Sequence, residues 1–141
     1  MTVYADTSFF VSVYVADLHS ATADRLLRSN PHMSLTPLHL AEWAHAIGQQ
    51  VFRGQMLATE AARVTGEFEA DRTSGLWTEV AMPDHAFELC AELARRYGAK
   101  LGVRTLDSLH VACALELKAE RFWTFDDRQA KLARAQGFRV S

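Results

Sequence analysis

The chain contains 141 residues, of which 49% are hydrophobic and 23% are charged. These proportions are typical of one globular domain, and they exclude disordered, collagen-like and low-complexity proteins. Fifteen lysines and arginines stand against seventeen aspartates and glutamates, and the formal net charge of −2 argues against a wholly basic nucleic-acid-binding protein. We therefore expect a single domain over residues 1–141.

In chain order, hydrophobic periodicity alternates between short extended runs and longer helical stretches. The pattern predicts a strand at 2–5, helices at 8–15 and from Ser20, a strand at 33–35, helices at 37–53 and 59–71, a strand at 76–81, a helix from 83 to 98, a loop at 99–104, a helix at 105–117, a strand at 121–124, a helix at 127–136 and a strand at 138–140. Strands separated by helices indicate crossover connections and parallel pairing. The predicted fold class is α/β, a three-layer sandwich with a central, mostly parallel sheet.

The cysteines and the apolar segments indicate in which cellular compartment the protein is expected. Cys90 and Cys113 are too few and too far apart for a disulfide framework or a zinc cluster, so we expect both to be buried and reduced. The longest apolar run, residues 9–16, is shorter than the roughly 18 residues that a membrane span needs. The N-terminus also lacks the basic segment of a signal peptide. These features favour a cytoplasmic protein without a membrane partner.

Acidic residues directly follow two of the predicted strands. Asp6 follows the strand at 2–5, and Asp126 and Asp127 follow the strand at 121–124. Ligands of open parallel sheets bind beyond the carboxyl ends of the strands, so these positions are the first candidates for a site. The chain has neither a glycine-rich dinucleotide motif nor a Walker motif, which argues against a dinucleotide enzyme or a P-loop hydrolase.

Two further acids lie on helices whose other positions are mostly apolar, namely Glu42 and Asp107. A buried carboxylate is costly unless it is paired or bound to metal, and several of them in one pocket would repel one another. Oxygen ligands favour Mg²⁺ or Mn²⁺ over zinc. Taken singly, Asp6 and Asp107 also fit helix capping, and Asp127 fits capping better than it fits a peripheral metal ligand. Taken together, the acids favour a metal site.

The segments around these acids resemble the four acidic motifs of PIN-domain nucleases. The matching segments are 3–8 (Val-Tyr-Ala-Asp-Thr-Ser), 40–42 (Leu-Ala-Glu), 104–110 (Arg-Thr-Leu-Asp-Ser-Leu-His) and 123–126 (Trp-Thr-Phe-Asp). Length, spacing and layout are most similar to the toxin ribonucleases of VapBC toxin–antitoxin systems. The resemblance covers essentially the whole chain. It implies a PIN fold, Mg²⁺-dependent cleavage of structured RNA such as tRNA or rRNA, a small antitoxin that blocks the site, and a homodimer.

The resemblance also assigns roles to individual residues. It implies an acidic quartet that holds the metal and carries catalysis: Asp6, Glu42, Asp107 and Asp126. It places supporting hydroxyl groups beside these acids: Thr7, Ser8 and Thr124. One or two metal ions would activate a water and stabilise the leaving oxygen, and the hydroxyls would orient the carboxylates.

Three other residues are candidates for roles near such a site. Arg104 is placed for contact with a substrate phosphate, and Trp43 could stack on an unpaired base or belong to the core. His110 lies one turn after Asp107 and fits a packed helix position better than a position facing the pocket. The series His-x-x-Glu-x-x-His at 39–45 does not match a zinc metalloprotease, whose histidines lie four residues apart.

Two other classes of function remain as alternatives. A receiver-like signalling module has a similar order of elements, but Thr78 and Glu79 stand where the third strand would present its phosphorylated aspartate. A non-catalytic RNA- or protein-binding domain could use the same fold. Such a domain would bind its partner but would not cut RNA.

Overall fold

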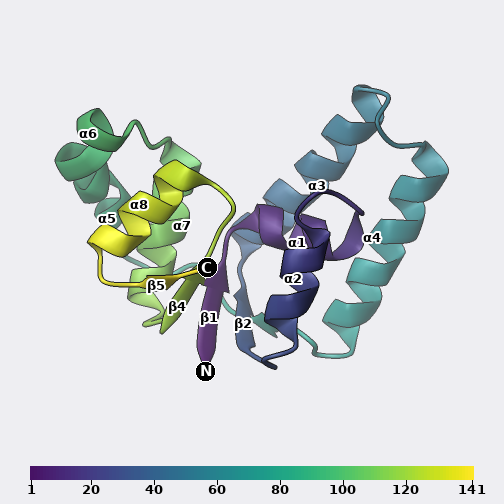
Figure 1. The fold of residues 1–141 in the computed structure, drawn as a ribbon, viewed down its shortest axis with the longest axis horizontal. Coiled ribbons are helices and arrows are strands. Elements are labelled where there is room, and N and C mark those ends of the chain that lie inside the picture. Colours follow the sequence, from purple (N-terminus) through teal and green to yellow (C-terminus); the bar gives the residue numbers. More distant parts are fainter. The chain divides into compact units, whose positions relative to one another are not determined.

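The structure, a computed structural model, describes residues 1–141 and consists of two compact units. The terminal unit comprises residues 1–6 and 81–141, and the central unit comprises residues 7–80. Each unit has its own strands and helices (Figure 1). Each unit also has its own buried side chains. The expectation of a single domain over the whole chain stays a prediction.

The terminal unit contains three parallel strands and carries both chain ends (Figure 1). Strand β4 (Arg121–Trp123) pairs with β1 (Thr2–Ala5) on one side and with β5 (Arg139–Val140) on the other. The helical elements of this unit are α5 (Ala86–Leu93), the π-helical turn η1 (Ala94–Gly98), α6 (Ala99–Leu101), α7 (Thr105–Glu116) and α8 (Asp127–Ala135). Helix α7 is the most deeply buried of these, because every residue from Ser108 to Ala114 is covered.

The central unit pairs two short parallel strands and adds four helices. Strand β2 (His32–Leu35) pairs with β3 (Thr78–Glu79). The helices are α1 (Thr7–Tyr14), α2 (Ser20–Leu27), α3 (Pro37–Phe52) and α4 (Ala58–Thr73). The indole of Trp43 on α3 stacks on the ring of Phe68 on α4, with 4.4 Å between centroids. This aromatic pair joins the two long helices of the unit.

Helix α3 begins with a capping box and with a proline in its first turn. Thr36 accepts a hydrogen bond from the His39 backbone N–H, and His39 Nδ1 accepts one from the Thr36 N–H in return. Pro37 occupies the first helical position, where its missing N–H costs nothing. His39 is therefore a capping residue in the core of this unit, which accounts for its place in the His-x-x-Glu-x-x-His series without a metal.

Two predicted elements, the strand at 76–81 and the helix at 83–98, have the wrong boundaries. The strand expected at 76–81 pairs only over Thr78–Glu79. The helix expected over 83–98 begins at Ala86, and helical structure continues through the predicted loop as far as Leu101. Good helix formers at 99–101 explain the extension, and the chain leaves the helix where Gly102 adopts a left-handed φ of 66°.

Every paired strand runs parallel to its neighbour and helices connect the strands, which confirms the α/β class with parallel pairing. Cys90 and Cys113 are buried and unbridged, as predicted. Trp77 and Trp123 are 5% and 2% exposed, so both belong to the core. None of the helices is both long and apolar enough to cross a lipid bilayer.

Candidate active site

The register of β1 and β4 brings two sequence motifs to the same edge. Ala5 pairs with Trp123 at the carboxyl ends of the two parallel strands, and the Asp6 backbone N–H donates to the Trp123 carbonyl at 2.9 Å. Asp6 and Thr124 are therefore the first residues beyond two adjacent strands. This edge of a parallel sheet is where ligand sites form.

Three carboxylates of the terminal unit are electrostatically coupled. Burial raises the pKa of Asp107, and the negative charges of Asp6 and Asp126 raise it further, while Arg104 opposes the shift. The side chains of Asp6 and Asp107 are only 14% and 20% exposed, so water screens their repulsion weakly. Acids separated by a hundred residues in the sequence thus act on one another in the folded unit.

Gln129, which the sequence analysis did not identify, connects these acids. Its side chain is fully buried, and its Nε2 amide donates to Asp6 Oδ1 at 3.3 Å and to the Asp107 carbonyl at 3.2 Å. Its Oε1 accepts from the Thr124 hydroxyl at 2.5 Å, and its backbone N–H donates to Asp126 Oδ1 at 2.8 Å. One glutamine therefore contacts all three acidic segments and the adjacent hydroxyl.

The start of α8 explains why Gln129 is available for this role. Asp126 is the N-cap and Gln129 is the third helical residue, a pattern that predicts a side chain bonded back to the cap N–H. Here the Thr124 hydroxyl accepts that N–H at 3.0 Å, so the Gln129 amide turns to Asp6 and Asp107 instead. The cap spacing was the signal that could have drawn attention to Gln129.

One capping prediction needs correction. Asp127 is not the cap of α8: it lies in the first turn and is exposed, while Asp126 makes the capping bond. At the start of α7 the cap position is occupied by Arg104, which makes no side-chain capping bond. Asp107 in the first turn of α7 is favoured by the partial positive charge of the helix start, which partly offsets the repulsion it meets.

His110 is packed, as expected, and it also reaches the acidic edge. Its side chain is fully buried, and its Nδ1 lies 2.7 Å from the hydroxyl of Tyr4 on β1. Its Nε2 lies 3.6 Å from Asp6 Oδ1, a distance too long for a good hydrogen bond but short enough for charge interaction if the ring is protonated. The buried histidine therefore contacts both Tyr4 on β1 and Asp6 at the end of that strand.

The remaining quartet member and its hydroxyl partner belong to the central unit. Thr7, the residue after Asp6 in the chain, donates through Oγ1 to Glu42 Oε1 at 2.7 Å. Thr7 is 5% exposed, so this contact is protected from solvent. Ser8 is exposed on α1, and its carbonyl accepts from Ser12. The supporting roles of Thr7 and Ser8 and the ligand role of Glu42 stay predictions.

The two candidate substrate contacts differ in accessibility. Arg104 is 81% exposed, and its Nε lies 3.5 Å from Asp107 Oδ2, so a phosphate beside the acids is within its reach. Trp43 is 3% exposed, and one ring face is covered by Phe68. Burial in the core does not support the base-stacking role considered for Trp43.

The donor set fits a hard divalent cation, although it is not a ready-made metal site. No three His, Cys, Asp or Glu side chains are arranged as a metal-binding group. The donors are carboxylate oxygens; burial raises the pKa of Asp107, and repulsion from Asp6 and Asp126 raises it further. A divalent cation with a preference for oxygen would relieve that repulsion, so the chemistry matches Mg²⁺ or Mn²⁺.

Comparison with known proteins identifies the family of this chain. The family model described as "PIN domain" matches residues 3–135. Similar solved structures include VapC20 of Mycobacterium tuberculosis, described as a Sarcin-Ricin loop cleaving toxin (TM-score 0.70, 20% identity, covering 98% of this chain and 97% of that one). VapBC2 of Rickettsia felis, bound to a DNA fragment from its promoter, has a TM-score of 0.68 and 14% identity, and covers 100% and 98% of the two chains.

A third similar structure is FitAcB of Neisseria gonorrhoeae (TM-score 0.65, 16% identity, covering 99% of this chain and 96% of that one). A search of curated protein sequences finds no significant match. At these identities the solved structures establish the fold, and the family model spans nearly the whole sequence. The receiver-like alternative is thereby removed. The chain belongs to the PIN domain family.

Proposed function

We propose that the protein is a metal-dependent endoribonuclease that acts as the toxin of a toxin–antitoxin pair. The observation that carries the proposal is the coupling of three carboxylates from separate segments, Asp6, Asp107 and Asp126, around a buried glutamine. A purely structural role would not require like charges to accumulate at a strand edge. Family membership supports the same conclusion, because this edge carries the motifs that resemble those of PIN nucleases.

The metal ligands in this proposal are Asp6, Asp107, Asp126 and Glu42. Glu42 is included on the resemblance to the PIN motifs alone, and within the central unit its carboxylate accepts a hydrogen bond from Thr7. Bound Mg²⁺, or Mn²⁺, would activate a water and neutralise charge on the phosphodiester oxygens. The protein groups then have separate tasks: Gln129 and Thr124 orient the carboxylates, and Arg104 binds a phosphate oxygen of the substrate.

The substrate and the partners follow from the family resemblance. We assign structured cellular RNA, tRNA or rRNA, as the substrate, in keeping with the description of VapC20 as a toxin that cleaves the sarcin-ricin loop. A cognate VapB-like antitoxin would block the site, and a homodimer and a cytoplasmic location complete the proposal. Each of these partners can be tested separately from the chemistry.

The test is cleavage of total cellular RNA by the purified protein, with Mg²⁺, with Mn²⁺ and with a chelator, followed by mapping of the cut ends. The wild-type protein should cut only when a divalent ion is present. Asp6→Asn should lose this activity, because it removes a metal ligand at the centre of the coupled group. Asp127→Asn is the matched control: it removes an exposed acid one residue from Asp126 and should retain activity.

Two results would contradict the proposal. Full activity of Asp6→Asn would show that the coupled acids do not carry the chemistry. RNA binding without any cut ends, in either metal, would instead identify a non-catalytic RNA-binding protein with this fold.

A further inference from the structure

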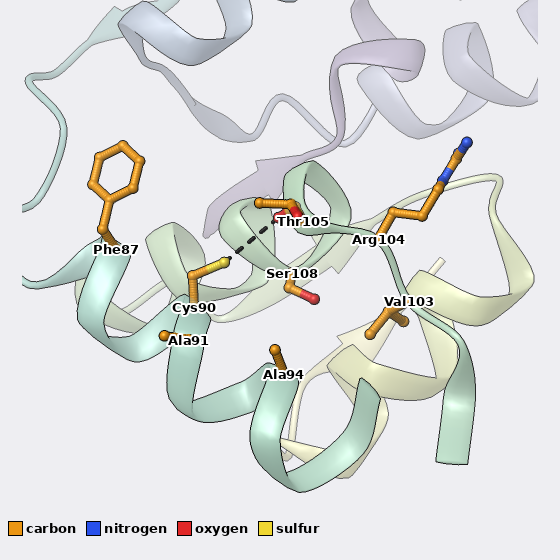
Figure 2. A pocket seen from close by; sticks show the side chains of 8 residues that line it. All are labelled: Phe87, Cys90, Ala91, Ala94, Val103, Arg104, Thr105 and Ser108. Carbon is orange, nitrogen blue, oxygen red and sulfur yellow. Dashed lines mark hydrogen bonds between the residues drawn. The ribbon is translucent and has the colours of Figure 1, made fainter. Parts of the chain in front are cut away.

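A cavity of about 270 Å³ lies within the terminal unit, and Arg104 is one of the residues that line it. Its walls come from α5, from η1 and from the segment 103–108 that leads into α7 (Figure 2). Ala91, Ala94 and Val103 form apolar sides. The volume lies just below the usual range for small-ligand pockets, roughly 300–1,000 Å³, and suits a single ring system. We call this cavity the α5–α7 pocket.

The hydroxyl of Ser108, a residue of helix α7, faces this pocket. Ser108 is 1% exposed, and Figure 2 shows its side chain at the centre of the lining residues, between Cys90 and Val103. The hydrogen bond drawn there runs from the Cys90 thiol to the Thr105 carbonyl at 3.5 Å and does not involve Ser108. The Ser108 hydroxyl is therefore positioned to hydrogen-bond with a polar group that enters the pocket.

The pocket adjoins the acidic residues through two neighbouring positions. Ser108 directly follows Asp107, and Arg104 lines the pocket while its Nε lies 3.5 Å from Asp107 Oδ2. Figure 2 shows the Arg104 side chain extending away from the apolar walls, and it is 81% exposed. A ligand that extends out of the pocket would therefore pass the Arg104 guanidinium on its way to Asp107, in the proposed site of cleavage.

We propose that the α5–α7 pocket binds one nucleobase of the RNA, next to the phosphodiester that is cleaved. The inference rests on the proposed function and specifies how its substrate is held. A base has flat apolar faces that fit between alanine and valine side chains, and its polar edge can hydrogen-bond with Ser108. The attached phosphate carries the charge that Arg104 would bind.

The lining favours a nucleobase over an apolar anchor from a protein partner. An aliphatic or aromatic anchor would fill the walls but would offer no polar group to the Ser108 hydroxyl. Phe87, which is 65% exposed and lines the same pocket, adds a ring on which a neighbouring base can stack. Apolar walls, a hydroxyl on the pocket wall and an exposed cation together match a nucleotide.

The first test measures binding without any cleavage. Each of the four ribonucleoside 5′-monophosphates is titrated into the full-length protein without metal, and NMR shifts of the Ala91, Ala94 and Val103 methyl groups are followed. At least one nucleotide should shift these methyl resonances in a saturable way. Ser108→Ala should weaken that binding about fivefold, the size expected for one hydrogen bond. Ala91→Trp should abolish it by filling the cavity.

The matched control fills a different cavity on the other unit. Ala44 lines a hollow of about 210 Å³ with His45, Gly48 and Gln49, and Ala44→Trp should leave nucleotide binding unchanged. Both alanines are exposed helix positions, so neither tryptophan disturbs a core. If no nucleotide shifts the methyl resonances, or if Ala91→Trp binds as well as Ala44→Trp, the pocket is not a base site. Saturable binding of an antitoxin peptide alone would assign it to a protein partner instead.

The second test separates this inference from the proposed function. A cleavable RNA is compared with the same RNA carrying an abasic residue on either side of the mapped cut. The wild-type protein should cut one abasic substrate far more slowly, and Ala91→Trp should cut intact and abasic RNA at the same low rate. Cutting that ignores the missing base overturns the pocket but leaves the nuclease intact. Nucleotide binding without any cutting overturns the nuclease but leaves the pocket.

Discussion

The hydrogen bonds of Gln129 predict a stability order that reverses with pH. Two substitutions separate its donor function from its packing. Gln129→Met keeps the length of the side chain but makes no hydrogen bond, whereas Gln129→Glu replaces the donor that faces Asp6 Oδ1 at 3.3 Å with an acceptor. At pH 8 the new carboxylate repels Asp6, so Gln129→Glu should be the less stable variant. At pH 5 a protonated glutamic acid can donate to Asp6, and the order should reverse.

The magnitude follows from the bonds that are lost. Gln129→Met removes two neutral hydrogen bonds, to Thr124 and to the Asp107 carbonyl, each worth about 1 kcal/mol. It also removes one bond to a charged group, worth about 1.5–3 kcal/mol. The added apolar contact of methionine offsets part of this, which leaves a loss of about 3 kcal/mol. For a chain of this length that corresponds to a fall in Tm of roughly 10 °C.

Thermal unfolding by circular dichroism without metal, at pH 5 and pH 8, measures both variants. Gln136→Met is the matched control, since the Gln136 amide is buried near the end of the same helix without a hydrogen-bond partner. Its Tm should stay the same or rise. Wild-type stability in Gln129→Met, or the same order of Gln129→Met and Gln129→Glu at both pH values, would refute the role assigned to Gln129.

Three further predictions concern the acids and the core. Because burial and the charges of Asp6 and Asp126 raise the pKa of Asp107, metal-free stability should fall as the pH rises from the ordinary aspartate pKa through the raised one. Asp107→Asn should therefore raise the free energy of unfolding at pH 7 by about 1 kcal/mol, measured with urea, while abolishing RNA cleavage; a less stable variant would contradict this. Thr7→Val should weaken Mg²⁺ binding about tenfold in calorimetry, because Glu42 loses its donor, and unchanged affinity would count against Glu42 as a ligand. Trp43→Ala should cost about 3–5 kcal/mol of unfolding free energy in a urea titration, since the indole stacks on Phe68 in the core, and an exposed residue would cost far less.

The sequence predicted the element order and the strand-end acids because both depend on local patterns. Hydrophobic periodicity located β1, α3 and α7 almost to the residue, and parallel strands necessarily align their carboxyl ends. The extent of β3 could not be predicted, because a strand ends where its partner stops pairing and β2 offers only a short edge. The ends of β3 are determined by its pairing with β2, which hydrophobic periodicity does not encode.

The contacts of Gln129 with Asp6 and Asp107, and the α5–α7 pocket, could not be predicted from the sequence for a similar reason. A glutamine on an amphipathic helix is typically solvent-exposed, and its burial depends on Asp6 and Asp107, which come from distant parts of the chain. For Trp43 the sequence left two roles open, stacking on a base and packing in the core. The neighbour that decides its role is Phe68, on another helix.

The most direct test of the account is to locate the bound ion. Mn²⁺ is titrated into the protein, and paramagnetic broadening of assigned NMR signals is followed at substoichiometric metal. The account predicts that the side-chain amide of Gln129 and the backbone amides of Asp107 and Thr7 broaden first, and that Asp6→Asn removes the effect. Broadening that begins instead on the exposed acidic face of α4, at Glu60, Glu67 and Glu69, would contradict it.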